Sequence, residues 1–155
     1  MAHSSCPTAV VNAPVSVVWS LLTNPAGWGR FFDVRIIGIS PEGPATVGQI
    51  ICAESGPSIL RLRLKLRFLK VDPVEHVIEL AGSLPLRLMV QQSLSCLSLG
   101  PDRCRVSYNC NFSVPSSWRG ALMYFLLRRE FDSGPADSLQ RLKRAAEAAY
   151  ARAYG

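Results

Sequence analysis

The segment 115–150 constrains the fold most, because it has the pattern of one long helix that needs a surface to cover. Ser116 or Ser117 suits the N-cap, and nearly all the residues that follow are compatible with a helix. Gly134 and Pro135 are predicted to interrupt it, because glycine favours a left-handed C-cap and proline a first helical position. The prediction is therefore a helix in two segments.

The second segment of this helix has a single apolar face. Leu139, Leu142 and Ala146 recur at steps of three and four residues, whereas Arg141 and Glu147 lie off that face. Such an amphipathic helix packs its apolar face on another part of the chain. The long stretch before it, 34–114, is predicted to form the sheet that it covers.

The clearest strand is predicted at 59–71, where leucines alternate with cations. Leu64 and Leu66, for example, are separated by Lys65 and followed by Arg67. This period of two is typical of a half-buried antiparallel strand. Turning the cations inward would bury unpaired charges at a high free-energy cost, so Leu64 and Leu66 are predicted to face the core.

The remaining elements complete one α+β domain over residues 1–155. Two short helices, at 14–22 and around 27–32, are expected after the first strand. Turns rich in glycine and proline separate the other strands. Together with 59–71, the expected strands are 6–13, 34–40, 47–54, 74–81, 86–99 and 103–114. About seven strands in an antiparallel meander, covered by the long C-terminal helix, are therefore predicted.

The charge of the chain bears on its partners. The net charge is +6 and the pI about 9.4, which raises the question of nucleic acid or anionic membranes. The basic residues are scattered, and no aromatic residues alternate with them as a base-stacking surface requires. Glu75 and Glu79 are predicted to lie opposite the basic row of 59–71, where cross-strand pairs contribute about 0.2–1 kcal/mol each. No nucleic-acid partner is predicted.

The composition also favours a cytoplasmic protein. Hydrophobic residues make up 48% of the chain, but no uninterrupted apolar run is long enough for a transmembrane helix. The first residues lack the charged and apolar regions of a signal peptide. The five cysteines are odd in number and form no Cys-x-x-Cys pair, as expected of reduced thiols.

Two motifs resemble the SRPBCC superfamily, which includes START-type lipid-binding domains, polyketide cyclases and birch-allergen-like proteins. The first is Val11-Asn-Ala-Pro-Val-Ser-Val-Val-Trp19, followed by Leu22-Thr-Asn-Pro25 and Trp28. The second is Leu139-Gln-Arg-Leu-Lys-Arg-Ala-Ala-Glu147, which is similar to the last helix of the family. The resemblance implies a helix-grip fold, with a curved sheet around the long helix and a cavity between them. Family members hold apolar molecules there, and some of them cyclise or otherwise transform the bound molecule.

The residues indicate neither a metal site nor a cofactor. The two histidines, His3 and His76, are far apart and have no partner at ligand spacing. Phosphate loops, dinucleotide fingerprints and the nucleophile elbow of hydrolases are absent from the sequence. A Cys–His pair, His76 with Cys96 or Cys110, fits the strand parity, but buried cysteines more often behave as small hydrophobic residues.

A candidate cavity can be assembled from side chains at the strand positions that are predicted to face inward. His76, Gln92 and Tyr108 are polar residues among apolar neighbours, which is typical of a small-molecule site. The alternative is that the backbone, or solvent at the end of the sheet, satisfies the hydrogen bonds of these side chains. The full predicted lining is Trp28, Phe32, Leu64, Leu66, His76, Gln92, Tyr108, Cys110, Met123 and Tyr124.

Three functions remain open at this point. The first is binding of an apolar small molecule, lipid-like or aromatic. The second is a cofactor-independent enzyme of the polyketide cyclase or aromatase type, with Tyr108 and His76 as acid–base candidates and Gln92 positioning a carbonyl. The third is an interaction module that uses the apolar run 121–127 to contact a partner, a membrane or a second copy in a homodimer.

Overall fold

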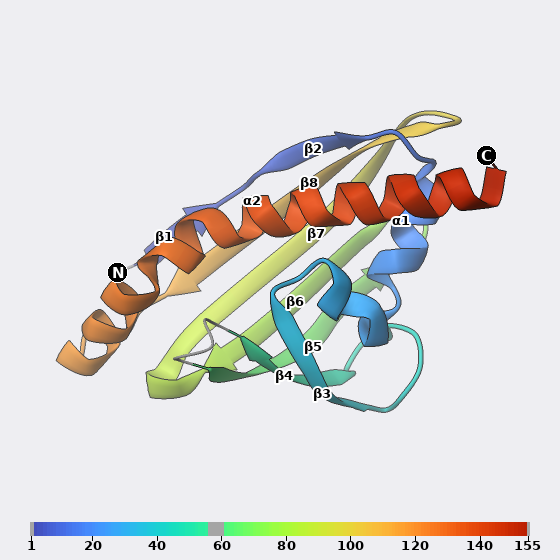
Figure 1. Cartoon of the computed structure of the whole chain (residues 1–155). Coiled ribbons are helices and arrows are strands. Elements are labelled where there is room, and N and C mark those ends of the chain that lie inside the picture. Colours follow the sequence, from blue (N-terminus) through green and yellow to red (C-terminus); the bar gives the residue numbers. More distant parts are fainter. Residues whose placement is uncertain (1, 56–60, 155) are drawn as a thin grey trace.

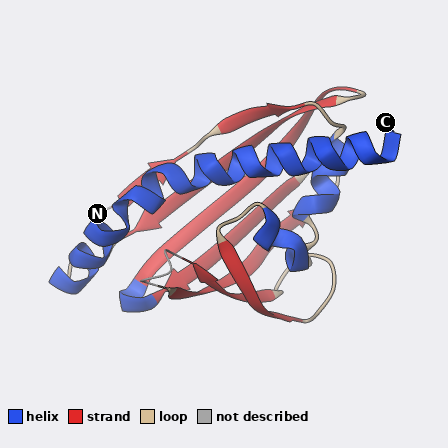
Figure 2. Cartoon of the chain, in the orientation of Figure 1, coloured by secondary structure: helices blue, strands red, loops and turns tan. Residues whose placement is uncertain are grey.

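The computed structural model describes residues 2–55 and 61–154. One long helix crosses the concave face of a curved antiparallel sheet, and the short helices close one side of the space between them (Figures 1 and 2). The elements are β1 (Ala2–Ser5), β2 (Thr8–Val11), α1 (Val15–Leu22), η1 (Pro25–Arg30), β3 (Val34–Ser40), β4 (Ile50–Ser55), β5 (Leu62–Asp72), β6 (Val77–Leu84), η2 (Pro85–Arg87), β7 (Leu88–Gly100), β8 (Arg103–Ser113) and α2 (Trp118–Tyr154).

The sheet confirms the predicted meander and has eight strands. Their order is β1-β8-β7-β6-β5-β4-β3, and β2 also pairs with β8. One strand was expected at 6–13, but β1 and β2 lie on either side of Pro7 and both pair with β8. Proline has no N–H to give to the ladder, so it marks the junction between the two short strands.

The helix α2 runs unbroken for 37 residues, so the predicted interruption at Gly134 and Pro135 is wrong. Gly134 does not adopt the left-handed conformation of a C-cap. Pro135 lies inside the helix, where it removes one backbone hydrogen bond. Both halves of α2 bury large side chains, Phe131 before the proline and Leu139 after it. This packing holds the two halves in line and offsets the lost hydrogen bond.

The start of α2 confirms Ser117 as the N-cap. Its hydroxyl oxygen accepts a hydrogen bond from the backbone N–H of Gly120 at 3.2 Å. Gly120 lies close against Pro115, since a Cβ at this position would come within 2.7 Å of the proline Cγ. A residue without a side chain is therefore required where the chain turns into the helix.

The alternation in β5 is confirmed. Leu64 and Leu66 are buried, whereas Arg63, Lys65 and Arg67 are exposed on the outer face. Residues 59 and 60, which begin the predicted strand, lie outside the described residues. So do residues 56 and 57, which belong to the turn expected after residue 54.

Of the two carboxylates expected opposite the cations of 59–71, Glu79 lies opposite one of them and Glu75 does not. The structure places Glu54 opposite Arg63, and Glu79 opposite Lys70 beyond a bulge. Glu75 belongs to the turn before β6 and not to a strand. The carboxylate of Asp72 accepts hydrogen bonds from two backbone N–H groups of this turn, both at 3.0 Å, and so delays the start of β6.

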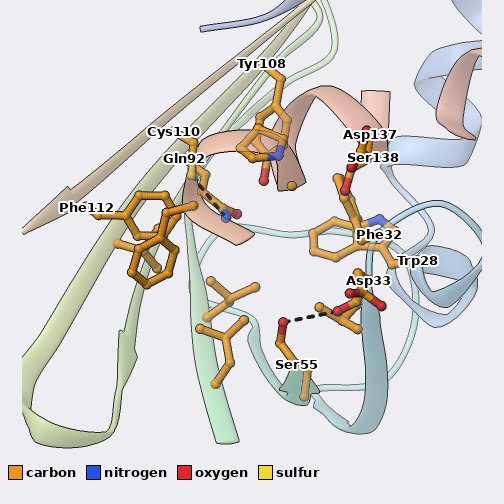
Figure 3. A pocket seen from close by; sticks show the side chains of 18 of the residues that line it. Trp28, Phe32, Asp33, Ser55, Gln92, Tyr108, Cys110, Phe112, Asp137 and Ser138 are labelled. Atoms are coloured by element: carbon orange, nitrogen blue, oxygen red, sulfur yellow. Dashed lines mark hydrogen bonds between the residues drawn. The ribbon is translucent and has the colours of Figure 1, made fainter. Parts of the chain in front are cut away.

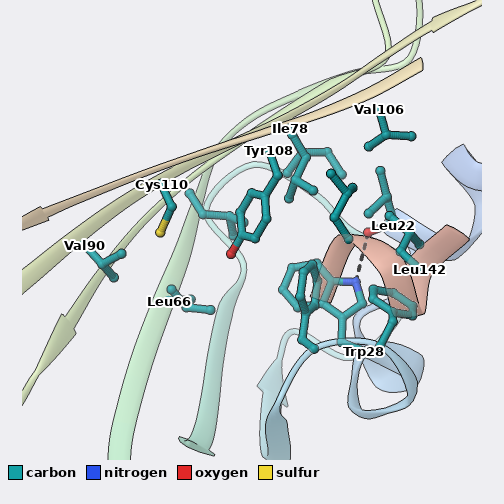
Figure 4. Packing of buried hydrophobic residues seen from close by; sticks show 14 of the residues in the cluster. Leu22, Trp28, Leu66, Ile78, Val90, Val106, Tyr108, Cys110 and Leu142 are labelled. Atoms are coloured by element: carbon teal, nitrogen blue, oxygen red, sulfur yellow. Dashed lines mark hydrogen bonds between the residues drawn. The ribbon is translucent and has the colours of Figure 1, made fainter. Parts of the chain in front are cut away.

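The core lies between the sheet and the helices, and Trp28 joins them. Its indole N–H donates to the backbone oxygen of Leu22 at 3.1 Å, which ties η1 to the end of α1 (Figure 4). Its ring lies 5.3 Å from that of Phe32 and 5.6 Å from that of Phe68 on the sheet. The short aromatic segment after α1 is therefore held rigidly against the sheet.

Leu142 provides a test of the contact between α2 and the sheet. It is almost fully buried, so Leu142→Ala should lower the free energy of unfolding by about 2–5 kcal/mol through the cavity that it leaves. Leu126→Ala, on the same helix but exposed, should change it by less than about 0.5 kcal/mol. Urea unfolding of both variants measures the difference. Equal effects would contradict the orientation of the helix.

Candidate functional site

A cavity of about 340 Å³ lies between the concave face of the sheet, η1 and the middle of α2 (Figure 3). Its volume falls within the range of small-molecule sites. Seven of the predicted lining residues surround it: Trp28, Phe32, Leu64, Leu66, Gln92, Tyr108 and Cys110. Strand parity and the aromatic segment together therefore located part of its wall.

His76 does not line this cavity. It lies in the turn before β6, with a left-handed backbone (φ 55°), and its ring meets that of Trp19 edge-on at 5.3 Å. Its predicted inward position assumed that the strand began at 74, whereas β6 begins at Val77. The acid–base role considered for His76 in the cavity therefore has no support in the geometry.

Met123 and Tyr124 also lie outside the cavity lining. The Tyr124 hydroxyl is 3.4 Å from Nδ1 of His3, whose Nε2 is 3.0 Å from the carboxylate of Asp132. Tyr124 thus packs toward β1. The residue of α2 that reaches the cavity from this side is Phe131, whose ring stacks on that of Phe112 at 4.2 Å.

The inner wall carries three polar groups from neighbouring strands. Gln92 of β7 lies opposite Cys110 of β8 in the register, and its amide N–H donates to the sulfur at 3.8 Å. Tyr108 lies two residues before Cys110 on the same face of β8. In Figure 3, Tyr108 and Gln92 face Trp28 and Phe32 across the cavity.

These groups carry no charge at neutral pH. Burial, and then the neighbouring Cys110, raises the pKa of the Tyr108 hydroxyl well above its ordinary value. Burial likewise raises the pKa of the Cys110 thiol to about 12, although hydrogen bonds with Gln92 and Tyr108 act in the opposite direction. The inner wall therefore offers hydrogen bonds from a neutral phenol and an amide, not a base or a thiolate nucleophile.

Charged residues lie at the mouth, and sequence reasoning missed them. Asp33, Arg129, Asp137 and Arg141 all line the cavity and remain partly or largely exposed. Among the described residues, none of these four takes part in an ion pair. The spacing of Asp137 and Arg141, one helical turn apart, was the available signal, but Arg141 was assigned only to the side away from the apolar face that packs on the sheet.

Ser138 is a further cavity residue that the sequence did not single out. Its side chain is buried, and it enters the cavity from α2 beside Asp137 (Figure 3). On the opposite side of the mouth, the Ser55 hydroxyl donates to the backbone oxygen of Asp33 at 3.1 Å. The mouth is therefore polar on both sides, whereas the interior is mainly apolar.

Metal binding has no support in the described ranges, which contain no group of three or more His, Cys, Asp or Glu side chains placed around one point. No helix in the same ranges is long and apolar enough to cross a membrane.

A curved antiparallel sheet that grips a long C-terminal helix around a cavity defines a helix-grip protein. Residues 5–147 match the family model described as polyketide cyclase/dehydrase and lipid transport, and the chain belongs to that family. No curated protein sequence matches the chain at a significant level.

Solved structures share the fold at low sequence identity. ZhuI aromatase/cyclase from Streptomyces sp. R1128 has a TM-score of 0.81 and 17% identity, over 100% of this chain and 99% of that one. Norcoclaurine synthase from Thalictrum flavum has a TM-score of 0.70 and 13% identity, over 96% of each chain. The di-domain aromatase/cyclase BexL of the BE-7585A biosynthetic pathway has a TM-score of 0.71 and 17% identity, over 94% of this chain and 46% of that one.

The cysteines provide a test of the buried, protonated interior. Cys6 and Cys52 are exposed, whereas Cys96, Cys104 and Cys110 are buried with raised pKa values. Because the thiolate is the reactive form, iodoacetamide should add quickly to two cysteines in the native protein and to all five in urea. Intact-mass spectrometry counts the adducts.

The control for this experiment is Cys52→Ser, which should leave one fast adduct. Rapid native modification of Cys110 would contradict the buried interior.

The sign of the pH dependence of stability follows from the same pKa shifts. The folded state retains thiol protons that the unfolded chain loses near pH 9.0, so the free energy of unfolding should fall as the pH rises above that value.

Proposed function

We propose that this protein binds an apolar small molecule, lipid-like or aromatic, that carries a carbonyl or hydroxyl group. The observation behind the proposal is that Tyr108 and Gln92 both line one wall of an otherwise largely apolar interior, from the adjacent strands β8 and β7. The phenol and the amide each combine a donor with an acceptor. A ligand oxygen placed between them would be fixed in orientation, while Trp28, Phe32 and Leu66 would contact its apolar body.

The free energy available from the cavity is sufficient without further chemistry. Burying about 300 Å² of ligand surface at about 25 cal/mol/Å² gives roughly 7–8 kcal/mol before the costs of association. Micromolar affinity is the expected outcome.

Five cysteines without a disulfide also support the predicted cytoplasmic location, where thiols stay reduced.

A second candidate function is catalysis of the polyketide cyclase type in the same cavity. The family description and the similarity to aromatase/cyclase structures support it. Proton transfer would then need an acid and a base near the bound molecule. The acid would be the Tyr108 hydroxyl, which can donate a hydrogen bond from the interior. The bases that the lining offers are the carboxylates of Asp33 and Asp137 at the mouth.

The first test is to identify what the purified protein carries. Native mass spectrometry of freshly purified protein, followed by organic extraction, should reveal a bound apolar compound of defined mass. The matched control is Val90→Trp, which fills part of the cavity from β7 and should reduce the amount of compound recovered. Wild-type protein at its calculated mass, with nothing in the extract, would count against a stable carrier.

The second test concerns the Tyr108 hydroxyl and uses two matched probes. Tyr108→Phe should weaken binding of 2-acetylnaphthalene about 2- to 10-fold, the value of one hydrogen bond. It should leave binding of 2-ethylnaphthalene unchanged, because this probe has no carbonyl. Isothermal titration calorimetry measures both affinities. Tyr124→Phe, outside the cavity, should affect neither.

The outcome of this test also separates the two candidate functions. If the compound extracted from the protein is converted by wild type and not by Tyr108→Phe, while both bind it with similar affinity, the protein is an enzyme. If neither protein converts the compound and the two differ only in their affinity for it, the protein is a carrier. Equal affinity of Tyr108→Phe and wild type for the ketone probe would remove Tyr108 as the polar contact.

A further inference from the structure

The first half of α2 exposes an apolar stripe that the cavity does not use. Trp118, Leu122, Phe125 and Leu126 recur at helical steps and are 71%, 50%, 70% and 58% exposed. The opposite side of this half of the helix packs through Leu127, which is buried. The apolar run 121–127 is thus divided between a face on the sheet and a face in solvent.

Arginines flank this stripe on both sides. Arg119 and Arg128 lie at its two borders by helical spacing. Arg129 follows Arg128 and also lines the mouth of the cavity. The Arg119 guanidinium is 5.4 Å from the Trp118 ring, and Arg128 contacts the Asp132 carboxylate at 3.7 Å. Residues 115–129 contain no Asp or Glu, so the charged side chains of this segment are all arginines, and the first carboxylate in contact with them is that of Asp132, one helical turn beyond Arg128.

The hairpin tip between β6 and β7 extends this surface. It contacts α2 and lies at the same end of the molecule, lower left in Figure 1. Leu86 and Arg87 there both have a left-handed backbone, φ 62° and 61°, which is strained for residues other than glycine. Leu86 remains exposed despite that strain. Together with the α2 stripe, this tip forms what we call the basic apolar end.

We propose that the basic apolar end binds the surface of an anionic lipid bilayer. Large apolar side chains bordered by cations are the pattern of helices that lie in a membrane interface. The apolar groups insert among the acyl chains, the tryptophan suits the headgroup level, and the arginines contact lipid phosphates. The contact is peripheral, and it does not depend on what the cavity holds.

The charge pattern argues against a second copy of the chain as the occupant. A two-fold dimer would place the same stripe on itself. With the helices antiparallel, Arg119 of one copy would approach Arg128 and Arg129 of the other, and with the helices parallel each arginine would approach its own counterpart. Like charges would meet in both cases, whereas an anionic surface complements them.

The shape of the surface favours lipid over a rigid protein partner. Trp118 and Phe125 are exposed on the helix, and Leu86 is exposed on a separate hairpin tip. A folded partner would need a matching pocket for each of them, but a bilayer deforms around projecting side chains. An acidic protein remains the competing occupant that the experiment addresses.

The experiment is vesicle co-sedimentation with the full chain. Vesicles of phosphatidylcholine with about one third phosphatidylglycerol should bind the protein, pure phosphatidylcholine should bind it weakly, and high KCl should reduce binding. Phe125→Glu should weaken binding at least about tenfold, because it removes apolar area and adds a like charge. Leu97→Glu is the matched control, an equally exposed apolar residue on β7, and should bind as wild type does.

Tryptophan fluorescence locates the contact. Of the three tryptophans, Trp28 is buried, Trp19 is half-buried and Trp118 is the most exposed, so the emission should shift to shorter wavelength on anionic vesicles. Trp118→Phe should remove most of the shift and retain most of the binding. Circular dichroism and light scattering should show that Phe125→Glu is folded and has the same oligomeric state as wild type.

Several outcomes would overturn the proposal. Absence of binding to anionic vesicles would do so directly, and would leave an acidic protein as the occupant to test. Full binding by Phe125→Glu, or loss of binding in Lys65→Glu on the outer face of the sheet instead, would place the contact elsewhere. A dimer that Phe125→Glu disperses, in protein that does not bind vesicles, would identify a homodimer surface.

Discussion

The packing of α2 across the concave face of the sheet is the contact on which the rest of the structure depends. A sheet with one apolar face needs a cover, and α2 provides it along most of its length through residues such as Phe131 and Leu142. Polar contacts anchor its second half, because Lys143 donates to the backbone oxygen of Val10 at 2.8 Å and Glu147 accepts from the N–H of Asn12 at 3.0 Å. The orientation of every cavity residue on α2 follows from this docking.

The cavity exists because small residues occupy the middle of that contact. Gly134, Pro135 and Ser138 line it from α2, between the bulky buried side chains of Phe131, which also lines the cavity, and Leu142. A helix of constant thickness on a curved sheet leaves a gap wherever its side chains are short. The glycine and proline that suggested a helix break therefore have another effect, which is to hollow the interface. Their helix-breaking tendency is a local preference, and tertiary packing overrides it.

Strand parity predicted the inner wall well for a geometric reason. Once the leucines of β5 are assigned to the core, the alternation of side chains in β7 and β8 places Gln92, Tyr108 and Cys110 on the same side. The rule fails where the chain leaves the strand, as at His76, because a turn has no fixed alternation. Along α2, Tyr124 could not be separated from Leu127 by sequence, since apolar residues occupy both faces of that half. For the mouth, the charged residues of the second half of α2 were assigned only to the side away from the apolar face that packs on the sheet, which does not bring them to the cavity.

The separation of neutral and charged groups limits where chemistry can take place. In the interior, burial keeps Tyr108 and Cys110 protonated, so this region can orient a ligand oxygen but cannot remove a proton at neutral pH. The carboxylates of the lining, Asp33 and Asp137, are exposed at the mouth. If the proposed catalytic function holds, the base would come from the mouth and the hydrogen bonds to the ligand oxygen from the inner wall. A ligand long enough to reach from Tyr108 to Asp33 or Asp137 would meet both kinds of group, whereas a shorter one would meet only the neutral inner wall.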